Sequence, residues 1–306
     1  MKAASISLFG GPEVVTFHNA GPRQAGADEA VVRVEAASVN PLDLKIIAGY
    51  MQPVFPVELP YIPGTDFSGV VSSVGDQVTH LKPGDRVFGR SSPSAGGAFA
   101  WQLIVAAADL CVIPSTMSFE QAAALPTAFG TARQALFEVG QLKRGERVLI
   151  HAGAGGVGSM AVQLAHMAGA HVIATASARN IELVKSLGAD EVIDYRSQDF
   201  TTLSDIDLVL DILGGSTLEN SWSVLGMSGR IATLVEFDIE SREGHVGQAV
   251  FFASATPFLQ EAVRQFSAGQ LQVITDSIFA LDETRAALEK VATGHACGKV
   301  IIRTSH

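Results

Sequence analysis

One closely spaced group of glycines in the sequence has the pattern of a phosphate-binding turn. In HAGAGGVGSM (151–160), Gly153, Gly155 and Gly158 fit the pattern G-x-G-x-x-G, between the strand-like run RVLI and the helix-like run VGSMAVQLAHMAG. We interpret the first glycine as a tight turn, the second as the approach of a pyrophosphate, and the third as helix–strand packing. Because a helix N-terminus attracts anions, the candidate contacts are Gly153, Ala154, Gly155, Gly156, Val157 and Gly158.

The residues after the second strand predict which dinucleotide binds. NAD sites carry an Asp or Glu about 20 residues after the glycines, where it holds the ribose 2′-hydroxyl. Here the strand ends in ATASARN (174–180), which offers Ser177 and Arg179 but no acid, and Tyr195 ends the third strand. Hydroxyl and guanidinium groups suit a 2′-phosphate. We therefore expect NADPH, with a merely solvated arginine as the alternative for Arg179.

Strand-like and helix-like runs alternate around these residues. The strand-like runs are RVLIHAG, HVIATAS, EVIDY, IDLVLDIL and GRIATLVEF, and the helix-like runs include VGSMAVQLAHMAG and RNIELVKSLG. This alternation predicts an α/β fold with a doubly wound, parallel Rossmann sheet covered on both faces. The helical run that precedes it should begin with a capping box of Ser118 and Gln121, be kinked or split by Pro126, and stop at Gly140.

The flanking parts of the chain predict a second domain. The first ~115 residues consist of short β segments separated by turns, which is typical of a β-barrel-like domain. After residue 271 the α+β character resumes, so we expect the chain to return to the first domain. The predicted domains are 1–117 with 272–306 for substrate, and 118–271 for the dinucleotide.

Composition narrows the range of partners and locations. The chain has 306 residues, of which 47% are hydrophobic and 17% charged, and a formal net charge of −10. Such an acidic protein repels nucleic-acid phosphates and anionic lipids, and no apolar run approaches the ~18 residues of a membrane span. Only two cysteines occur, Cys111 and Cys297, which excludes a disulfide framework and fits a reducing cytoplasm. We expect a cytoplasmic protein without nucleic-acid or membrane partners.

The order of its motifs gives the chain a resemblance that covers nearly its whole length. The matching stretches are FGGPEVV, ASVNPLDLKIIAG, PGTDFSGVVSSVG, KPGDRVFG, AAALPTAFGTARQAL, IHAGAGGVGSMAVQLA, ARNIELVKSLGADEVIDYR and GHACGKVIIR. The sequence resembles the zinc-free, quinone oxidoreductase-like group of the medium-chain dehydrogenase/reductase superfamily, including alkenal/enone reductases. The resemblance implies a GroES-like catalytic β-barrel domain beside the Rossmann domain, NADPH as cofactor, and a homodimer.

The resemblance also predicts that no metal is bound. Zinc alcohol dehydrogenases carry a cysteine where this chain has Asn40, and a histidine–glutamate pair where it has Thr65 and Asp66. Asparagine and threonine cannot supply a tetrahedral zinc site. Without a Lewis acid, the expected reaction is reduction of an acceptor that is already electrophilic, a quinone or an α,β-unsaturated carbonyl compound, by hydride from NADPH.

Three residues near the start are the catalytic candidates that the resemblance implies. Asn40 would donate a hydrogen bond to the substrate carbonyl, Lys45 would hold the nicotinamide ribose or deliver a proton, and Tyr50 would line the pocket or protonate the enolate. Further cofactor candidates are Thr127, Thr131, Leu213, Leu234, Phe252 and Lys299. For Asp43 and His151 a structural role is expected, and Phe55, Tyr61 and 250–254 are candidate apolar walls.

Two other functions remain open at this point. An enoyl-thioester reductase shares the expected architecture, although no basic patch for a carrier protein is evident. A non-catalytic NADPH-binding protein of the crystallin type would keep the glycine turn and lack turnover. The sequence does not separate quinone from alkene reduction.

Overall fold

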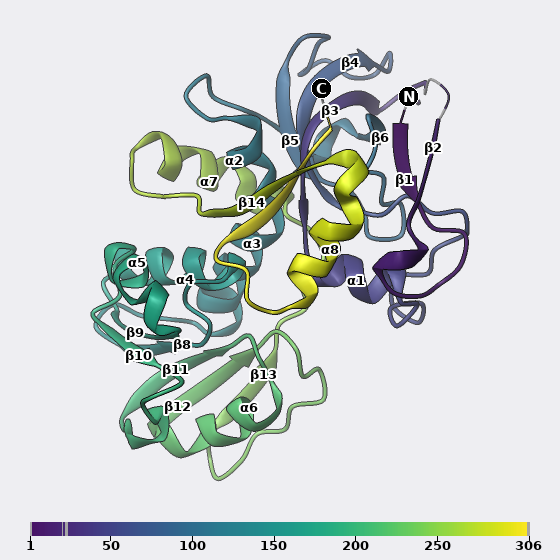
Figure 1. Cartoon of the computed structure of the whole chain (residues 1–306). Helices are drawn as coiled ribbons and strands as arrows, with labels where there is room; N and C mark the ends of the chain where they lie inside the picture. Colours follow the sequence, from purple (N-terminus) through teal and green to yellow (C-terminus); the bar gives the residue numbers. More distant parts are fainter. Residues whose placement is uncertain (1, 20, 22–23, 305–306) are drawn as a thin grey trace. The chain divides into compact units, whose positions relative to one another are not determined.

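The computed structural model describes residues 2–19, 21 and 24–304, and these group into two compact units. The first unit comprises Met1–Thr127, Ser254–Gly269 and Val273–His306, and the second comprises Ala128–Ala253 with Gln270–Gln272. Each unit is built around a sheet of its own, and the fold is mixed α/β as predicted (Figure 1).

The second unit contains a six-stranded parallel sheet. Its order is β10-β9-β8-β11-β12-β13, so the sequence direction reverses between β8 and β11. This is the Rossmann order, and ligands bind such sheets at the carboxyl ends of the strands, next to the reversal. The strands are β8 (Arg147–Ile150), β9 (His171–Ala176), β10 (Glu191–Asp194), β11 (Ile206–Asp211), β12 (Leu225–Thr233) and β13 (Val246–Ala249).

Helices cover both faces of this sheet, with α4 and α5 on one side and α6 on the other (Figure 1). The apolar residues between sheet and helices include Leu149, Ile173 and Leu218, all of them buried. The helical segments are α4 (Gly156–Met167), α5 (Ile181–Ser186) and α6 (Gly215–Ser221), a π-helical turn η3 (Gln134–Val139), and the short 3-10 turns η4 (Ala178–Asn180), η5 (Phe200–Thr202) and η6 (Trp222–Val224).

The first unit is dominated by a seven-stranded, mostly antiparallel sheet of order β14-β15-β3-β4-β5-β7, with β6 paired to β3. A separate pair, β1 with β2, completes its strands. The bounds are β1 (Lys2–Ser5), β2 (Thr16–Asn19), β3 (Glu29–Val39), β4 (Asp66–Val74), β5 (Arg86–Arg90), β6 (Gln102–Ala106), β7 (Leu110–Val112), β14 (Thr275–Ala280) and β15 (Lys299–Arg303).

The long strand β3 organises this sheet. Its first half pairs with β6, its second half pairs with β15, and β4 runs along its other edge. In the antiparallel register of β15, Val300 lies opposite Val39, which brings the start of β15 to the end of β3. The C-terminal segment is therefore part of the first unit's sheet (Figure 1, yellow beside purple).

Helices α1 (Pro41–Ile47), α2 (Phe119–Ala123), α7 (Thr256–Ser267) and α8 (Thr284–Ala292) belong to the first unit, with 3-10 turns η1 (Pro12–Val14), η2 (Ala107–Asp109) and η7 (Leu281–Glu283). The helical run after Ser118 has the predicted capping box, since Gln121 N donates to Ser118 Oγ and Ser118 N to Gln121 Oε1. It is split before Pro126, where α3 (Pro126–Arg133) begins. A proline has no N–H to continue the helix.

The two units differ from the predicted domains at both boundaries. Helix α2 lies with the first unit because Ser68 Oγ donates to Phe119 O at 2.6 Å and Arg303 pairs with Glu120 at 2.6 Å. Helix α7 also lies with it, and Thr256 Oγ1 donates to Asp109 Oδ1 at 2.7 Å. The sequence of neither helix indicates which unit it packs against. The predicted boundaries therefore lie where strand-like and helix-like runs change over.

No helix among the described residues combines the length and the apolar character needed to cross a membrane.

Candidate functional site

The glycine turn connects the end of β8 to the start of α4. Ala152 reverses the chain with a φ of +53°, and Gly153 N donates to Thr175 O on β9 at 2.8 Å. A Cβ at Gly158 would lie 2.1 Å from Ala152 O, and one at Gly153 would lie 2.8 Å from Ala174 Cβ. Both glycines are therefore required by the packing of the turn itself.

The middle glycine is less crowded than the other two. A Cβ at Gly155 would meet only Ala152 O, at 3.2 Å. Gly155 is the N-cap of α4, and the first N–H groups of this helix have no partner one turn earlier. N–H groups at the start of a helix fit the pyrophosphate of a dinucleotide.

His151, directly before the turn, is buried and held by hydrogen bonds on both ring nitrogens. Nδ1 lies 3.3 Å from Thr175 Oγ1, which accepts from Ala152 N, and Nε2 lies 3.0 Å from Ser221 Oγ, which donates to Thr217 O. A neutral imidazole protonated on Nε2 satisfies every one of these bonds. Burial lowers the pKa of His151 to about 4. His151 thus braces the turn from inside the unit, in line with the expected structural role.

The structure brings together the residues predicted to bind the 2′-phosphate. Ser177 follows β9 and Tyr195 follows β10, and Tyr195 N donates to Ala176 O at 3.2 Å. Arg179 lies in η4 directly after Ser177. Arg196, which the sequence reasoning did not single out, stacks against the half-exposed Tyr195 ring at 5.7 Å. Its place in the motif IDYR, beside Tyr195, was the available signal.

Three other cofactor candidates follow the remaining strands of this sheet. Leu213 comes after β11 and is 55% exposed, Leu234 comes after β12, and Phe252 comes after β13. All three therefore lie at the carboxyl edge, where ligands bind in such sheets. Thr131, by contrast, is a buried residue of α3.

One further residue of this edge escaped prediction. Asp211, at the end of β11, is fully buried and accepts from Leu213 N, Gly214 N and Thr233 Oγ1, at 3.1, 3.0 and 2.7 Å. These bonds fix the turn that carries Leu213. An aspartate between an apolar strand and a Gly-Gly pair was the signal for such a role.

In the first unit, Asn40 is held in a buried cluster of polar side chains. It is the N-cap of α1, where its N–H donates to Asp43 Oδ2 at 2.7 Å. Its side chain, 3% exposed, donates through Nδ2 to Asp66 Oδ2 at 3.1 Å. Lys299 Nζ donates to Asn40 Oδ1 at 2.5 Å and to Val39 O at 3.0 Å.

Thr127 and Arg90 close the other side of this cluster. Thr127 donates to Asp66 through its N–H and its hydroxyl, at 3.2 and 2.7 Å. Arg90 Nε donates to Thr127 Oγ1 at 3.1 Å and lies 4.0 Å from Asp66 Oδ1. Thr127, predicted to contact the nicotinamide, is thus anchored on the same carboxylate as Asn40.

The cluster contains two acidic and two basic side chains that are all buried. Burial raises the pKa of Asp43 to about 7, because a carboxylate loses its hydration and Asp66 is close. Burial lowers the pKa of Lys299 and of Arg90, while the neighbouring carboxylates act in the opposite direction. Asp43 Oδ1 has no hydrogen-bond partner in the described part of the chain.

This cluster does not fit a zinc ion. Zinc takes cysteine, histidine or carboxylate ligands, whereas the chain has Asn40 and Thr65 beside Asp66. The Lys299 ammonium group, 2.5 Å from Asn40 Oδ1, also places a positive charge where a cation would have to bind. Across the residues that the structure describes, no three His, Cys, Asp or Glu side chains are grouped to hold a metal ion.

Lys45 and Tyr50 lie apart from the buried cluster. Asp43 is on the buried side of α1, whereas Lys45 is exposed and lines a groove of about 310 Å³ with Tyr50, which is 79% exposed. The structure therefore separates these two candidates from Asn40 within the first unit. Tyr61, a candidate apolar wall, is buried in the core, and its hydroxyl donates to Pro93 O at 2.7 Å.

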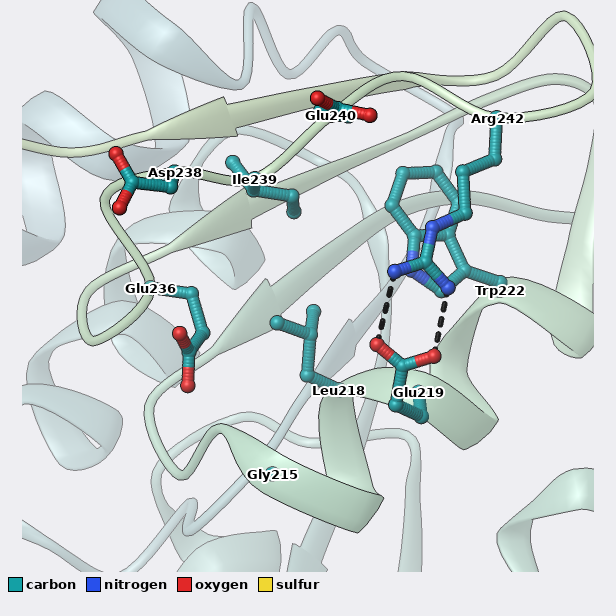
Figure 2. A pocket seen from close by; sticks show the side chains of 9 residues that line it. All are labelled: Gly215, Leu218, Glu219, Trp222, Glu236, Asp238, Ile239, Glu240 and Arg242. Atoms are coloured by element: carbon teal, nitrogen blue, oxygen red, sulfur yellow. Dashed lines mark hydrogen bonds and ion pairs between the residues drawn. The ribbon is translucent and has the colours of Figure 1, made fainter.

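Figure 2 shows a second hollow, of about 330 Å³, in the second unit. Arg242 donates to both carboxylate oxygens of Glu219, at 2.6 and 2.9 Å, and its guanidinium lies 5.3 Å from the Trp222 ring. The other charged residues that line it are acidic, namely Glu236, Asp238 and Glu240. An acidic lining repels phosphate groups, so this hollow does not suit the dinucleotide.

Comparison with known proteins gives matches along the whole chain. The family model "Alcohol dehydrogenase GroES-like domain" matches residues 26–116, and "Zinc-binding dehydrogenase" matches residues 187–302. The spinach "Quinone-oxidoreductase homolog, chloroplastic" is 35% identical over 323 residues, which cover 99% of this chain and 98% of the relative. The tomato "2-methylene-furan-3-one reductase" is 34% identical over 317 residues, which cover 99% of this chain and 79% of the relative.

A solved structure is similar over the same extent. The quinone oxidoreductase from Coxiella burnetii superposes with a TM-score of 0.92 at 32% sequence identity, covering 100% of this chain and 99% of the other.

Proposed function

Because the chain belongs to the medium-chain dehydrogenase/reductase superfamily, we propose that it is an NADPH-dependent reductase of quinones or α,β-unsaturated carbonyl compounds that works without zinc. The observation that carries the proposal is the glycine turn between β8 and α4, where Gly153 and Gly158 leave no room for a Cβ and Gly155 caps the helix. The reductase names of its relatives support the reaction class.

In such a reaction the protein mainly has to orient the cofactor and the acceptor and to donate a hydrogen bond. When bound, reduced nicotinamide supplies a hydride. The acceptor gains negative charge on its oxygen, and a fixed N–H group nearby stabilises that charge. Asn40 can do this because, within the described residues, Asp66 takes one of its two Nδ2 protons and leaves the other for the acceptor.

The polar residues after β9 and β10 support NADPH over NADH. A 2′-phosphate needs cationic and hydroxyl groups, and Ser177, Arg179, Tyr195 and Arg196 supply them. Asp194, the acid at the end of β10, is already engaged, because its carboxylate accepts from Ser197 Oγ at 2.8 Å and from Arg196 N at 3.2 Å. The Ser197 hydrogen bond is the main reason why the pKa of Asp194 lies below its usual value.

Isothermal titration tests this preference. We expect NADPH to bind at least about tenfold more tightly than NADH, since a phosphate–arginine contact is worth about 1.5–3 kcal/mol. Arg179→Ala should weaken NADPH binding and leave NADH binding nearly unchanged. Arg144→Ala is the matched control, because Arg144 is exposed and precedes β8, at the opposite end of the strands. Equal binding of the two cofactors by the unmodified protein would refute the NADPH assignment.

Turnover separates the proposed function from its alternatives. NADPH oxidation is followed by absorbance with 1,4-benzoquinone, a 2-alkenal and a 2-enoyl thioester as acceptors. Turnover with the first or the second supports the proposal, and turnover with the thioester alone supports an enoyl-thioester reductase. Tight NADPH binding without any turnover supports a non-catalytic protein of the crystallin type.

A homodimer and a cytoplasmic location also remain proposals. The first follows from the family resemblance and the second from the low number of cysteines, two in the whole sequence. Gel filtration of the purified protein tests the first.

A further inference from the structure

We propose that Lys299 is a positioning residue for Asn40, whose amide orientation its ammonium group fixes so that one Nδ2–H is presented to the oxygen of the electron acceptor. The inference rests on the proposed function, and it replaces the expectation that Lys299 contacts the cofactor. Lys299 is 5% exposed, and its Nζ donates to Asn40 Oδ1 and to Val39 O.

The surroundings allow only one orientation of the Asn40 amide. Its oxygen faces the Lys299 ammonium, a donor at 2.5 Å, and its nitrogen faces the Asp66 carboxylate, an acceptor at 3.1 Å. Turning the amide over would set donor against donor and acceptor against acceptor. The cost is large because the side chains are buried, and polar groups interact strongly in the low-dielectric interior.

The ammonium group also controls the charge around the amide. Asp66 lies directly behind Asn40 Nδ2, and an uncompensated carboxylate there would repel an acceptor oxygen that is gaining negative charge. Arg90 is 4.0 Å from Asp66 and compensates one charge only. Lys299 adds the second cation, which offsets whatever negative charge Asp43 carries. It also polarises the amide so that its N–H groups donate more strongly.

Such a role differs from cofactor binding in what a substitution changes. Lys299→Met keeps an unbranched side chain that is one atom shorter and removes its charge and donors. We expect kcat for the acceptor to fall by about ten- to a hundredfold, as when an oxyanion donor is misplaced. The Kd for NADPH should stay within about twofold. Lys82→Met is the control, since the Lys82 side chain is 82% exposed in the same unit.

A double substitution tests whether Lys299 acts through Asn40. Asn40→Ala alone should lower kcat, and adding Lys299→Met to it should cost no more than about twofold further. If the double variant loses kcat by the product of the two single factors, the proposal is overturned. A rise in the Kd for NADPH with unchanged kcat would overturn it too, and would make Lys299 a cofactor contact. If Lys299→Met does not fold, Lys299→Gln, which keeps a donor without the charge, gives the same comparison.

A spectroscopic readout keeps this test independent of turnover. The chain has only four asparagines, Asn19, Asn40, Asn180 and Asn220, so selective 15N labelling yields four side-chain amide pairs, and Asn40→Ala identifies the one of interest. In Lys299→Met we expect the Asn40 pair to shift and its protons to exchange faster, while the other three pairs stay in place. An unmoved Asn40 pair would refute the positioning role even if no acceptor is ever reduced. Absence of turnover with a shifted pair would instead refute the proposed function alone.

Discussion

The buried imidazole of His151 makes the stability of the second unit depend on pH. It is 1% exposed, its ring contacts Phe200 edge to face at 4.8 Å between centroids, and both nitrogens are bonded as a neutral ring requires. A proton on Nδ1 would face the Thr175 hydroxyl, which then has to give up its present bond. The folded protein therefore resists protonation that the unfolded chain accepts.

The size of the effect follows from the difference between the two pKa values. The pKa is about 4 in the folded protein and 6.5 for an ordinary histidine. Above pH 6.5 both states are neutral and the residue contributes no pH dependence. Below pH 6.5 the unfolded state takes up the proton first, so the free energy of unfolding decreases as the pH is lowered. The decrease is about 2 kcal/mol at pH 5 and about 3 kcal/mol below pH 4.

Comparison with His151→Gln isolates this contribution, because every other group titrates in both proteins. We would follow urea unfolding by the fluorescence of Trp222 in the second unit, after replacing Trp101, the other tryptophan, by phenylalanine. At pH 7.5 the variant should be less stable by about 1 kcal/mol through loss of the Phe200 contact. At pH 5 the variant should be more stable than the unmodified protein. The linkage would be refuted if the difference in unfolding free energy between the two proteins changed by less than about 0.5 kcal/mol from pH 7.5 to pH 5.

Three further substitutions test the second unit. Gly158→Ala should lower the unfolding free energy by about 3 kcal/mol because its Cβ would collide with Ala152 O. Gly155→Ala, whose Cβ would lie 3.2 Å from the same oxygen, should be destabilised less and should bind NADPH at least tenfold more weakly. Normal binding of NADPH by Gly155→Ala would contradict the pyrophosphate site. Arg230→Met should cost about 2–3 kcal/mol in urea unfolding, because a partly buried guanidinium that donates to three backbone carbonyls and a carboxylate is lost. The exposed Arg242→Met serves as its control, and an equal loss there would contradict this reasoning.

Much of the second unit could be predicted from local sequence patterns. Strand, glycine turn and helix follow one another within about 20 residues, so the sequence around Gly153 already contains the partners that shape the turn. The split at Pro126 and the capping box at Ser118 were equally local. Backbone hydrogen bonding and steric fit decide such features, and both act between near neighbours.

The buried cluster of the first unit was beyond this kind of reasoning. Lys299 and Asn40 are separated by 259 residues, and Asp66 and Thr127 by 61. Nothing in the sequence around Lys299 states that β15 pairs with the end of β3 in the register that opposes Val300 to Val39. The residue types were available as candidates, but their pairing depends on contacts that only the folded sheet supplies.

That register also has a consequence for synthesis on the ribosome. Asn40 and Asp66 are translated early, whereas their cationic partner on β15 emerges only after the main part of the second unit, Ala128–Ala253, has been made. Domains generally fold as units while the chain is being made, so the glycine turn can form while the first unit still lacks a strand and a compensating charge. A nascent chain that stalls before β15 would therefore keep its dinucleotide turn and leave the Asn40 amide without its fixed orientation.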